Sequence, residues 1–260
     1  MKIKDIYDHI NSVAPFCLQE GYDNSGLCIG SMGYEVKKIL VALDCTIDVA
    51  KEAAEKGCEL IVTHHPVIFH AIKKLDLESV AGCLAASRTS VISAHTNFDS
   101  AVMNDILCER LGLSPSDIIA EENGAGIGCI CDTEGFAPHE LAERIAAALG
   151  NKVVRYNRKN SSADESLLRR IAVCSGSGGS FLNDVLAKGC DAFITGDVKH
   201  DVFIDAYNSN IVIYDAGHFH TENIFCEYMK NDLSSHFPEA EVSIAESNFD
   251  VLDYFLEVRG

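Results

Sequence analysis

Basic residues are scarce in this chain: Lys and Arg number 21 against 39 Asp and Glu, a formal net charge of −18 over 260 residues. Such an acidic chain repels nucleic acid and anionic lipid, which disfavours general nucleic-acid binding. No apolar stretch is long enough to span a bilayer, and the first residues lack the apolar segment of a secretion signal. We therefore expect a cytoplasmic protein without a membrane partner.

Cys-x-x-Cys pairs are also absent, although the chain has 11 cysteines. Only Cys129 and Cys131 are closely spaced, and alternation along a strand would place both on the same face. We expect reduced thiols that pack as small apolar groups. Cysteine-ligated zinc is the weaker alternative.

Apolar strand-like runs alternate with helix-like stretches along the whole chain. Ile3, Ile6 and Ile10 follow helical spacing up to Pro15. Further helices are expected at 47–56, 77–87, 104–111, 139–149, 180–188, 200–207 and 221–231. Strands are expected at 38–43, 59–63, 90–94, 127–131, 152–156, 170–174, 191–195, 211–214 and 242–246. Alternation with near-continuous apolar strands is typical of an α/β fold with a parallel sheet covered on both faces.

Histidines and carboxylates follow three of the expected strands. They are His64 and His65 after 59–63, His95 and Asp99 after 90–94, and His218 and Glu222 after 211–214. The carboxyl ends of parallel strands form the crevice where ligands bind. Imidazole and carboxylate together are the ligand set of divalent transition metals. The sequence therefore predicts a metal site at these strand ends.

Each of these segments also has a purely structural interpretation. A histidine pair at a strand exit can be one buried and one solvated side chain. Asp99 can cap the helix near residue 104, and His95 can be a ligand, an outer partner of a ligand or an acid/base. Glu222 lies four residues after His218, on one helical face, but it can equally be a first-turn acid.

A glycine-rich turn, Ser175-Gly176-Ser177-Gly178-Gly179-Ser180, lies between an expected strand and helix. Its backbone N–H groups could cradle a phosphate, although a simple tight turn is the favoured interpretation. Positive charge gathers nearby in sequence, and a solvated loop is favoured over phosphate contact. The basic residues are Arg155, Arg158, Lys159, Arg169 and Arg170.

Several ordered blocks resemble one known family, the GTP cyclohydrolase type 2 homologues, also called NIF-three-like dinuclear-metal proteins. The blocks are Tyr22-Asp23-Asn24-Ser25-Gly26-Leu27, Thr63-His64-His65-Pro66, His95-Thr96-Asn97-Phe98-Asp99, Gly176-Ser177-Gly178, Thr195-Gly196-Asp197-Val198-Lys199 and Asp215-Ala216-Gly217-His218-x-x-x-Glu222. The resemblance covers nearly the whole chain, in the short form of the family. It departs at Ser100–Met103, where the segment is shortened, and at Asp201, where the family usually has a histidine.

The resemblance implies two divalent metal ions per chain, with His64, His65, Asp99, His218 and Glu222 as ligands and Glu222 touching both ions. It also implies two α/β domains with mainly parallel or mixed sheets, the second inserted into the first. We place the first domain at 1–122 plus 212–260 and the inserted domain at 123–211, with 121–126 as a linker. Family members look like toroidal homohexamers whose metal sites face an interior cavity.

The expected function is that of a metal-dependent hydrolase similar to GTP cyclohydrolase, acting on a nucleotide-like or phosphorylated small molecule, with His95 as the acid/base candidate. The alternative is a non-catalytic metal-binding chaperone, store or regulatory interaction protein. Nitrogen and oxygen ligands without thiolate suit zinc, iron or manganese, and the sequence does not choose among them.

Overall fold

The computed structural model describes residues 1–122, 124–158 and 167–255, and the chain divides into two compact units. The first unit comprises Met1–Asn104, Glu121–Ile127 and Asn223–Asn248. The second comprises Asp105–Ala120, Gly128–Glu222 and the segment that follows Asn248. The strands of the second sheet lie in sequence between those of the first, which confirms the predicted α/β class with an insertion. The domain bounds predicted from the sequence stay a prediction.

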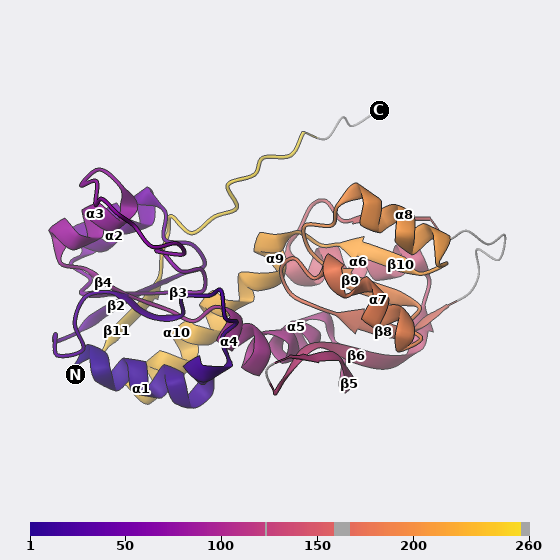
Figure 1. Ribbon diagram of the computed structural model, residues 1–260, viewed down its shortest axis with the longest axis horizontal. Coiled ribbons are helices and arrows are strands. Elements are labelled where there is room, and N and C mark those ends of the chain that lie inside the picture. The colour runs from indigo at the N-terminus through magenta and orange to yellow at the C-terminus, as the bar shows by residue number, and fades with distance from the viewer. Residues whose placement is uncertain (123, 159–166, 256–260) are drawn as a thin grey trace. The chain divides into compact units, whose positions relative to one another are not determined.

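The first unit is built on a five-stranded mixed sheet with the order β1-β4-β3-β2-β11. Its strands are β1 (Gly26–Ile29), β2 (Lys38–Ala42), β3 (Leu60–Thr63), β4 (Ser90–Ser93) and β11 (Glu241–Ile244). Only β1, on the edge, is antiparallel to its neighbour. Figure 1 shows helices α2 (Ile47–Lys56) and α3 (Val80–Ser87) over one face, and α1 (Ile3–Val13) and α10 (Ile224–His236) over the other.

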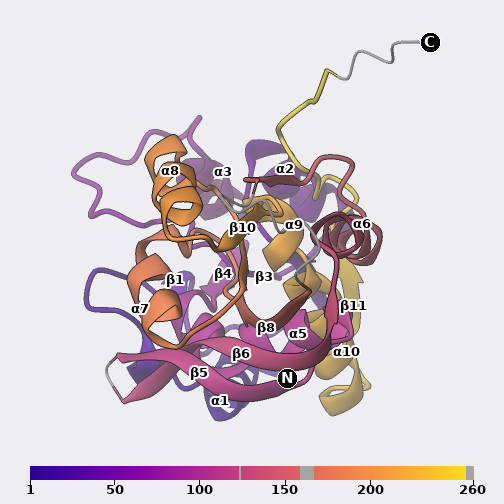
Figure 2. The ribbon, with the colours of Figure 1, turned by 90° about the vertical axis from the view of Figure 1, so that its right-hand side faces the viewer.

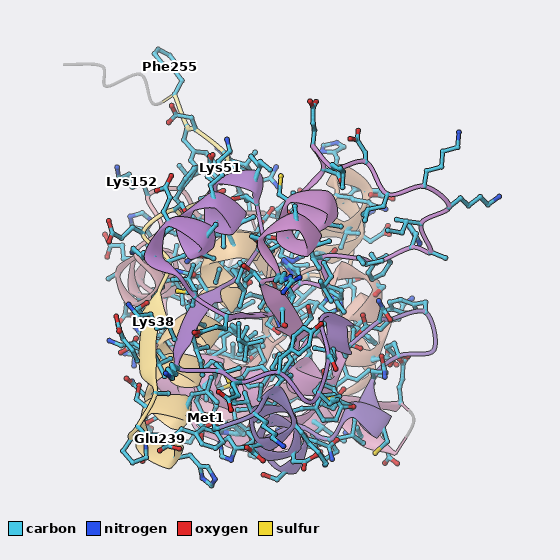
Figure 3. All side chains as sticks on the ribbon, turned by 90° about the vertical axis from the view of Figure 1, so that its left-hand side faces the viewer. Met1, Lys38, Lys51, Lys152, Glu239 and Phe255 are labelled. Carbon is cyan, nitrogen blue, oxygen red and sulfur yellow. The ribbon has the colours of Figure 1, made fainter. Side chains whose placement is uncertain are left out.

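Helix α2 shows why the local sequence folds as it does. The Thr46 hydroxyl accepts a hydrogen bond from the Val49 N–H at 3.2 Å and so caps the first turn. The helix ends at Gly57, whose φ of 67° lies in the left-handed region that glycine adopts without strain. Val49 and Ala53 face the buried core, while Lys51 points outward (Figure 3).

The second unit is built on a six-stranded mixed sheet with the order β5-β6-β8-β9-β10-β7. Its strands are β5 (Pro115–Glu122), β6 (Ala125–Phe136), β7 (Arg155–Tyr156), β8 (Leu168–Val173), β9 (Ala192–Thr195) and β10 (Val212–Asp215). Strands β8, β9 and β10 are parallel. Figure 2 shows α7 (Leu182–Ala187) and α8 (His200–Asn208) on one side of this sheet and α6 (Pro138–Leu149) on the other. Helix α5 (Asn104–Leu111) precedes β5.

Three local expectations need correction. The strand before His218, β10, belongs to the second sheet, so the three histidine-bearing strands do not share one sheet. Residues 121–126 are no linker, because strand structure extends into this segment from both sides as β5 and β6, with residue 123 outside the described residues. The helix expected at 221–231 is two helices, α9 (His218–Glu222) and α10, separated at Asn223.

The cysteines lie among the described residues, and no disulfide joins any of the eleven. Seven are buried, as expected for small apolar groups. Cys131 and Cys129 both face α5: the sulfur of Cys131 lies 3.7 Å from that of Cys108, and the sulfur of Cys129 lies 3.5 Å from an Asp105 carboxylate oxygen. Within the part of the chain that the structure describes, no helix is long and apolar enough to cross a membrane.

Candidate metal centre

In the first unit, the exits of β3 and β4 bring three histidines together. His64 and His65 follow Thr63 directly, and His95 lies two residues beyond the end of β4. One ring nitrogen from each lies within 4.8 Å of the others. Asp99 lies beside them, with its Oδ1 3.5 Å from the Nε2 of His64. The structure thus places together the four candidate residues that this unit contains.

The Nδ1 atom of each ring is held by an oxygen from a neighbouring strand end. The pairs are His64 with the Ala94 carbonyl at 2.8 Å, His65 with the Asp44 carboxylate at 2.7 Å and His95 with the Asp23 carboxylate at 2.8 Å. A carbonyl or an ionised carboxylate only accepts, so Nδ1 donates and the lone pair of the neutral ring is on Nε2. Metal-binding histidines are oriented by hydrogen bonds of this kind.

Asp23 is the most strongly held of these partners. Its carboxylate accepts hydrogen bonds from the His95 ring, from the Thr96 hydroxyl and backbone N–H, and from the Ser25 hydroxyl. Burial alone would raise the pKa of Asp23, but the hydrogen bonds from His95, Thr96 and Ser25 hold that pKa well below its usual range. Asp23 is therefore an ionised acceptor that fixes the orientation of His95.

Two phenylalanine rings pack against one side of this cluster. The His64 side chain is fully buried, and its ring centroid lies 5.3 Å from that of Phe225 and 6.4 Å from that of Phe98. Phe98 and Phe225 also pack edge to face with a centroid separation of 5.0 Å. Exclusion of water on that side strengthens any charge interaction that His64 makes.

The second unit repeats the arrangement at the exit of β10. His218 and Glu222 are the first and last residues of α9, and the Nε2 of His218 lies 2.9 Å from the Oε2 of Glu222. The Nδ1 of His218 lies 2.9 Å from the Oδ2 of Asp197, which follows β9. Asp197 has a φ of 50°, in the left-handed region that costs energy for residues other than glycine. These two predicted residues are thus adjacent, and the Asp197 carboxylate lies on the Nδ1 side of the His218 ring.

The glycine-rich turn makes room for Glu222. Gly176 has a φ of 58°, and a Cβ at this position would collide with the Glu222 carboxylate. The Gly176 N–H donates to the Thr221 hydroxyl at 3.0 Å, and the Gly178 N–H donates to the Thr195 hydroxyl at 2.8 Å. Because these two backbone donors have partners inside the protein, the contacts favour the tight-turn interpretation over a phosphate cradle.

Several other sequence candidates have structural contacts of their own. Arg155 binds the Asp215 carboxylate and lies over the Phe203 ring at 5.6 Å. Arg170 makes two bonds to the Asp132 carboxylate, Arg169 donates to the Glu134 carbonyl, and Lys159 lies outside the described residues. His220, which also lies in α9, joins no cluster of three or more metal-type ligands among the described residues, and its Nδ1 lies 3.8 Å from Asp250.

Sequence reasoning gave no role to the carboxylates that orient these rings. Asp44 and Asp197 each lie two residues beyond the end of a parallel strand, β2 and β9. Each follows a strand that pairs with the strand preceding a candidate histidine: β2 pairs with β3, and β9 pairs with β10. That position is the signal that could have identified them. Asp23 and Asp197 stand inside recognised sequence blocks, whereas Asp44 stands outside every block.

Two mixed sheets with histidine and carboxylate clusters at their strand exits define an α/β protein whose clustered residues are consistent with a metal site. The model of the family described as Duf34/NIF3 (NGG1p interacting factor 3) matches residues 1–250. The chain belongs to this family.

Relatives and solved structures are similar over most of the chain. A "GTP cyclohydrolase 1 type 2 homolog" from Clostridium acetobutylicum is 36% identical over 233 residues, covering 85% of each chain. The crystal structure of Staphylococcus aureus hypothetical protein SA1388 is similar, with a TM-score of 0.89, 26% identity and coverage of 98% of this chain and 99% of that one. The structure of reduced HcgD from Methanocaldococcus jannaschii has a TM-score of 0.82 at 29% identity, covering 95% of this chain and 98% of that one.

Proposed function

We propose that this chain is a dinuclear metal-dependent hydrolase that acts on a nucleotide-like or phosphorylated small molecule. The observation that carries the proposal is the common orientation of four strand-exit histidines. Each has its Nδ1 at 2.7–2.9 Å from a carbonyl or carboxylate oxygen. Three of the four, His64, His65 and His218, are proposed ligands, and metal-binding histidines are regularly oriented by an acceptor on the other ring nitrogen.

The proposed ligands are the imidazole nitrogens and carboxylates that the two units offer: His64, His65 and Asp99 from the first, His218 and Glu222 from the second. This donor set fits zinc, iron or manganese, because it combines nitrogen with oxygen and lacks thiolate. A bound divalent ion supplies a Lewis acid and lowers the pKa of a coordinated water.

His95 is the proposed acid/base. Asp23 accepts the hydrogen bond of its Nδ1 at 2.8 Å, which leaves the proton exchange to Nε2. The negative charge of Asp23 also stabilises the ring when Nε2 takes up a proton. The His95 ring lies next to His64 and His65, with centroid separations of 5.2 Å and 5.5 Å, so a proton would be exchanged beside two proposed ligands.

A guanine nucleotide is the first substrate to test, because the similar Clostridium acetobutylicum protein is called a "GTP cyclohydrolase 1 type 2 homolog". Hydrolysis of GTP and of a nucleotide and phosphoester panel should be measured with metal-loaded wild type, His64→Ala and Glu222→Gln. We expect turnover in the wild type and at least about a hundred-fold loss in both variants, the scale on which electrostatic catalytic groups act. Equal trace turnover in all three would refute a hydrolase and leave the non-catalytic alternative.

Metal content tests the centre separately from the reaction. Elemental analysis after reconstitution with zinc, iron or manganese should give two ions per chain, and less than one would refute the dinuclear centre. We also propose self-association to a toroidal homohexamer, as the family resemblance implies. Light scattering on the metal-loaded protein checks this assembly, and the mass of a monomer would contradict it.

A further inference from the structure

An exposed aromatic pair lies beside the histidines of the first unit. Tyr22 is 67% exposed and Phe69 is 38% exposed, and both are large rings carried on loops. Their ring centroids are 6.3 Å apart, at an angle of 51°. Phe69 also meets the His95 ring edge to face, with 6.2 Å between centroids. A continuous series of ring contacts therefore runs from solvent to the histidine cluster.

Hydrogen bonds within the first unit hold the two loops that carry these rings. The Asn24 side-chain amide donates to the Ile68 carbonyl at 2.6 Å, which joins the residues next to Tyr22 to those next to Phe69. Asp23, immediately after Tyr22, is fixed by its bonds to His95 and its neighbours. The aromatic pair is thus preorganised, so little free energy is lost in ordering these loops when a ligand binds.

The phenol of Tyr22 adds a polar group to this surface. Burial of part of the ring, together with the negative charges of Glu20 and Asp23, raises the pKa of Tyr22, so the hydroxyl stays protonated at neutral pH. Among the residues that the structure describes, no hydrogen bond to this hydroxyl is formed. It is an available donor at the edge of an apolar platform.

We propose that Tyr22 and Phe69 form the stacking site for the purine ring of a nucleotide whose reacting part reaches the histidine cluster. A flat heteroaromatic ring suits this surface, because every purine has a π-face that stacks on aromatic side chains, and its edge can accept a hydrogen bond from the phenol. This inference rests on the proposed function, since it names the substrate class of the same site. It assigns to Tyr22 and Phe69 binding only and no chemical step.

Calorimetric titration of the metal-loaded full-length protein with GTP, and separately with inorganic tripolyphosphate, tests the proposal. Tyr22→Ala and Phe69→Ala should each weaken GTP binding about ten-fold, equivalent to about 1.4 kcal/mol, which lies within the range for lost aromatic stacking. Both should leave tripolyphosphate binding and metal content unchanged. Tyr22→Phe should keep most of the GTP affinity. Tyr34→Ala is the matched control, because Tyr34 is 53% exposed in the same unit and, among the described residues, its ring makes no contact with a histidine ring.

Three results would overturn the proposal. The first is a wild type that binds GTP no more tightly than tripolyphosphate, and the second is GTP binding by both alanine variants with wild-type affinity. The third is a change in the mass of the assembly in both variants, which would make the pair an interface with a second copy. Turnover distinguishes this proposal from the hydrolase proposal. If GTP binding depends on Tyr22 and Phe69 but GTP is not consumed, the stacking proposal holds and the hydrolase proposal fails. If the alanine variants turn over GTP with unchanged KM, the hydrolase proposal holds and the stacking proposal fails.

Discussion

Replacement of Asp197 by glycine should separate stability from metal binding. Asp197 is held at a φ of 50°, and its carboxylate lies 2.9 Å from the Nδ1 of His218. A left-handed backbone costs an L-residue about 1–2 kcal/mol, with less for aspartate, and glycine removes this cost. The Asp197 side chain is 58% exposed, so its ion pair with His218 contributes at most about 1 kcal/mol to folding.

These magnitudes predict a small change in stability and a large change in metal affinity. The Asp197→Gly variant should unfold in urea with a free energy within about 1 kcal/mol of the wild type, because the relief of backbone strain is offset by the lost ion pair and by the greater unfolded-state entropy of glycine. Its affinity for zinc or cobalt should fall about 10- to 100-fold, the usual effect of removing a partner that orients a metal-binding histidine. Asp197→Asn should lie between the two proteins in metal affinity, because its amide oxygen can still accept from His218.

A control distinguishes relief of strain from loss of orientation. Asn210 has a φ of 57° in the same unit, is exposed and lies after α8. Asn210→Gly should match Asp197→Gly in stability and bind metal as the wild type does. The reasoning is refuted if Asp197→Gly binds metal with wild-type affinity, or if its stability falls by more than about 2 kcal/mol together with the affinity.

Three further predictions concern Gly176, Asp23 and Glu52. Gly176→Ala should lower metal content and cost at least about 1 kcal/mol in thermal denaturation, more than Gly189→Ala, which has a similar positive φ but open space around its Cβ. Asp23→Asn should destabilise the fold by about 2–4 kcal/mol, measured by urea unfolding, and a loss below about 1 kcal/mol would contradict its buried network. Glu52→Gln should cost about 1–3 kcal/mol at pH 7 and progressively less as the pH falls from 4.5 to 2, and a constant difference in acid unfolding would refute it.

The sign of the last prediction follows from the contacts of Glu52. Burial alone would raise its pKa, but hydrogen bonds from Lys56, from Ser247 and from two backbone N–H groups lower it to about 2. A carboxyl whose pKa is lower in the folded than in the unfolded protein adds stability above its unfolded pKa, about 4.3. That contribution is lost as the pH falls through 2, so wild type and variant should converge there.

Much of the fold could be predicted from the sequence, because the central parallel strands are apolar on both faces. The runs at 38–43, 59–63, 90–94 and 191–195 correspond to β2, β3, β4 and β9. The strands that escaped prediction are edge strands such as β1 and β5. Strand β5 is largely exposed and carries acidic residues near both ends, as edge strands commonly do to avoid pairing with other chains, and such strands lack apolar periodicity.

The candidate ligands could be predicted from the sequence, because each lies one to a few residues beyond an apolar run. The sheet to which each preceding strand belongs could not be predicted. Nothing in the run 211–214 distinguishes a strand of the first sheet from one of the second, because both sheets are equally apolar at their centres. The carboxylates Asp44 and Asp197 were also not predictable from spacing along the chain. Their relation to the histidines exists only once strands are paired.

The strand register explains which carboxylate or carbonyl lies beside each histidine. Ala42 of β2 pairs with Thr63 of β3, so Asp44 and His65, each two residues further on, stand opposite one another. Thr63 pairs with Ser93 of β4, which sets His64 opposite Ala94. Parallel strands lie about 4.8 Å apart, close enough for a side chain just past one strand to reach its neighbour.

The same relation holds in the second sheet, where Thr195 of β9 pairs with Asp215 of β10 and brings Asp197 beside the turn that leads to His218. A histidine that leaves a parallel strand therefore finds its orienting oxygen on the next strand, at nearly the same register. Once strand order and register are known, the partner of a strand-exit histidine can be identified by counting residues along the neighbouring strand. Moving Asp44 by one position, with Asp44→Gly and Cys45→Asp combined, should break the pair with His65 and lower metal affinity about as much as Asp44→Ala does.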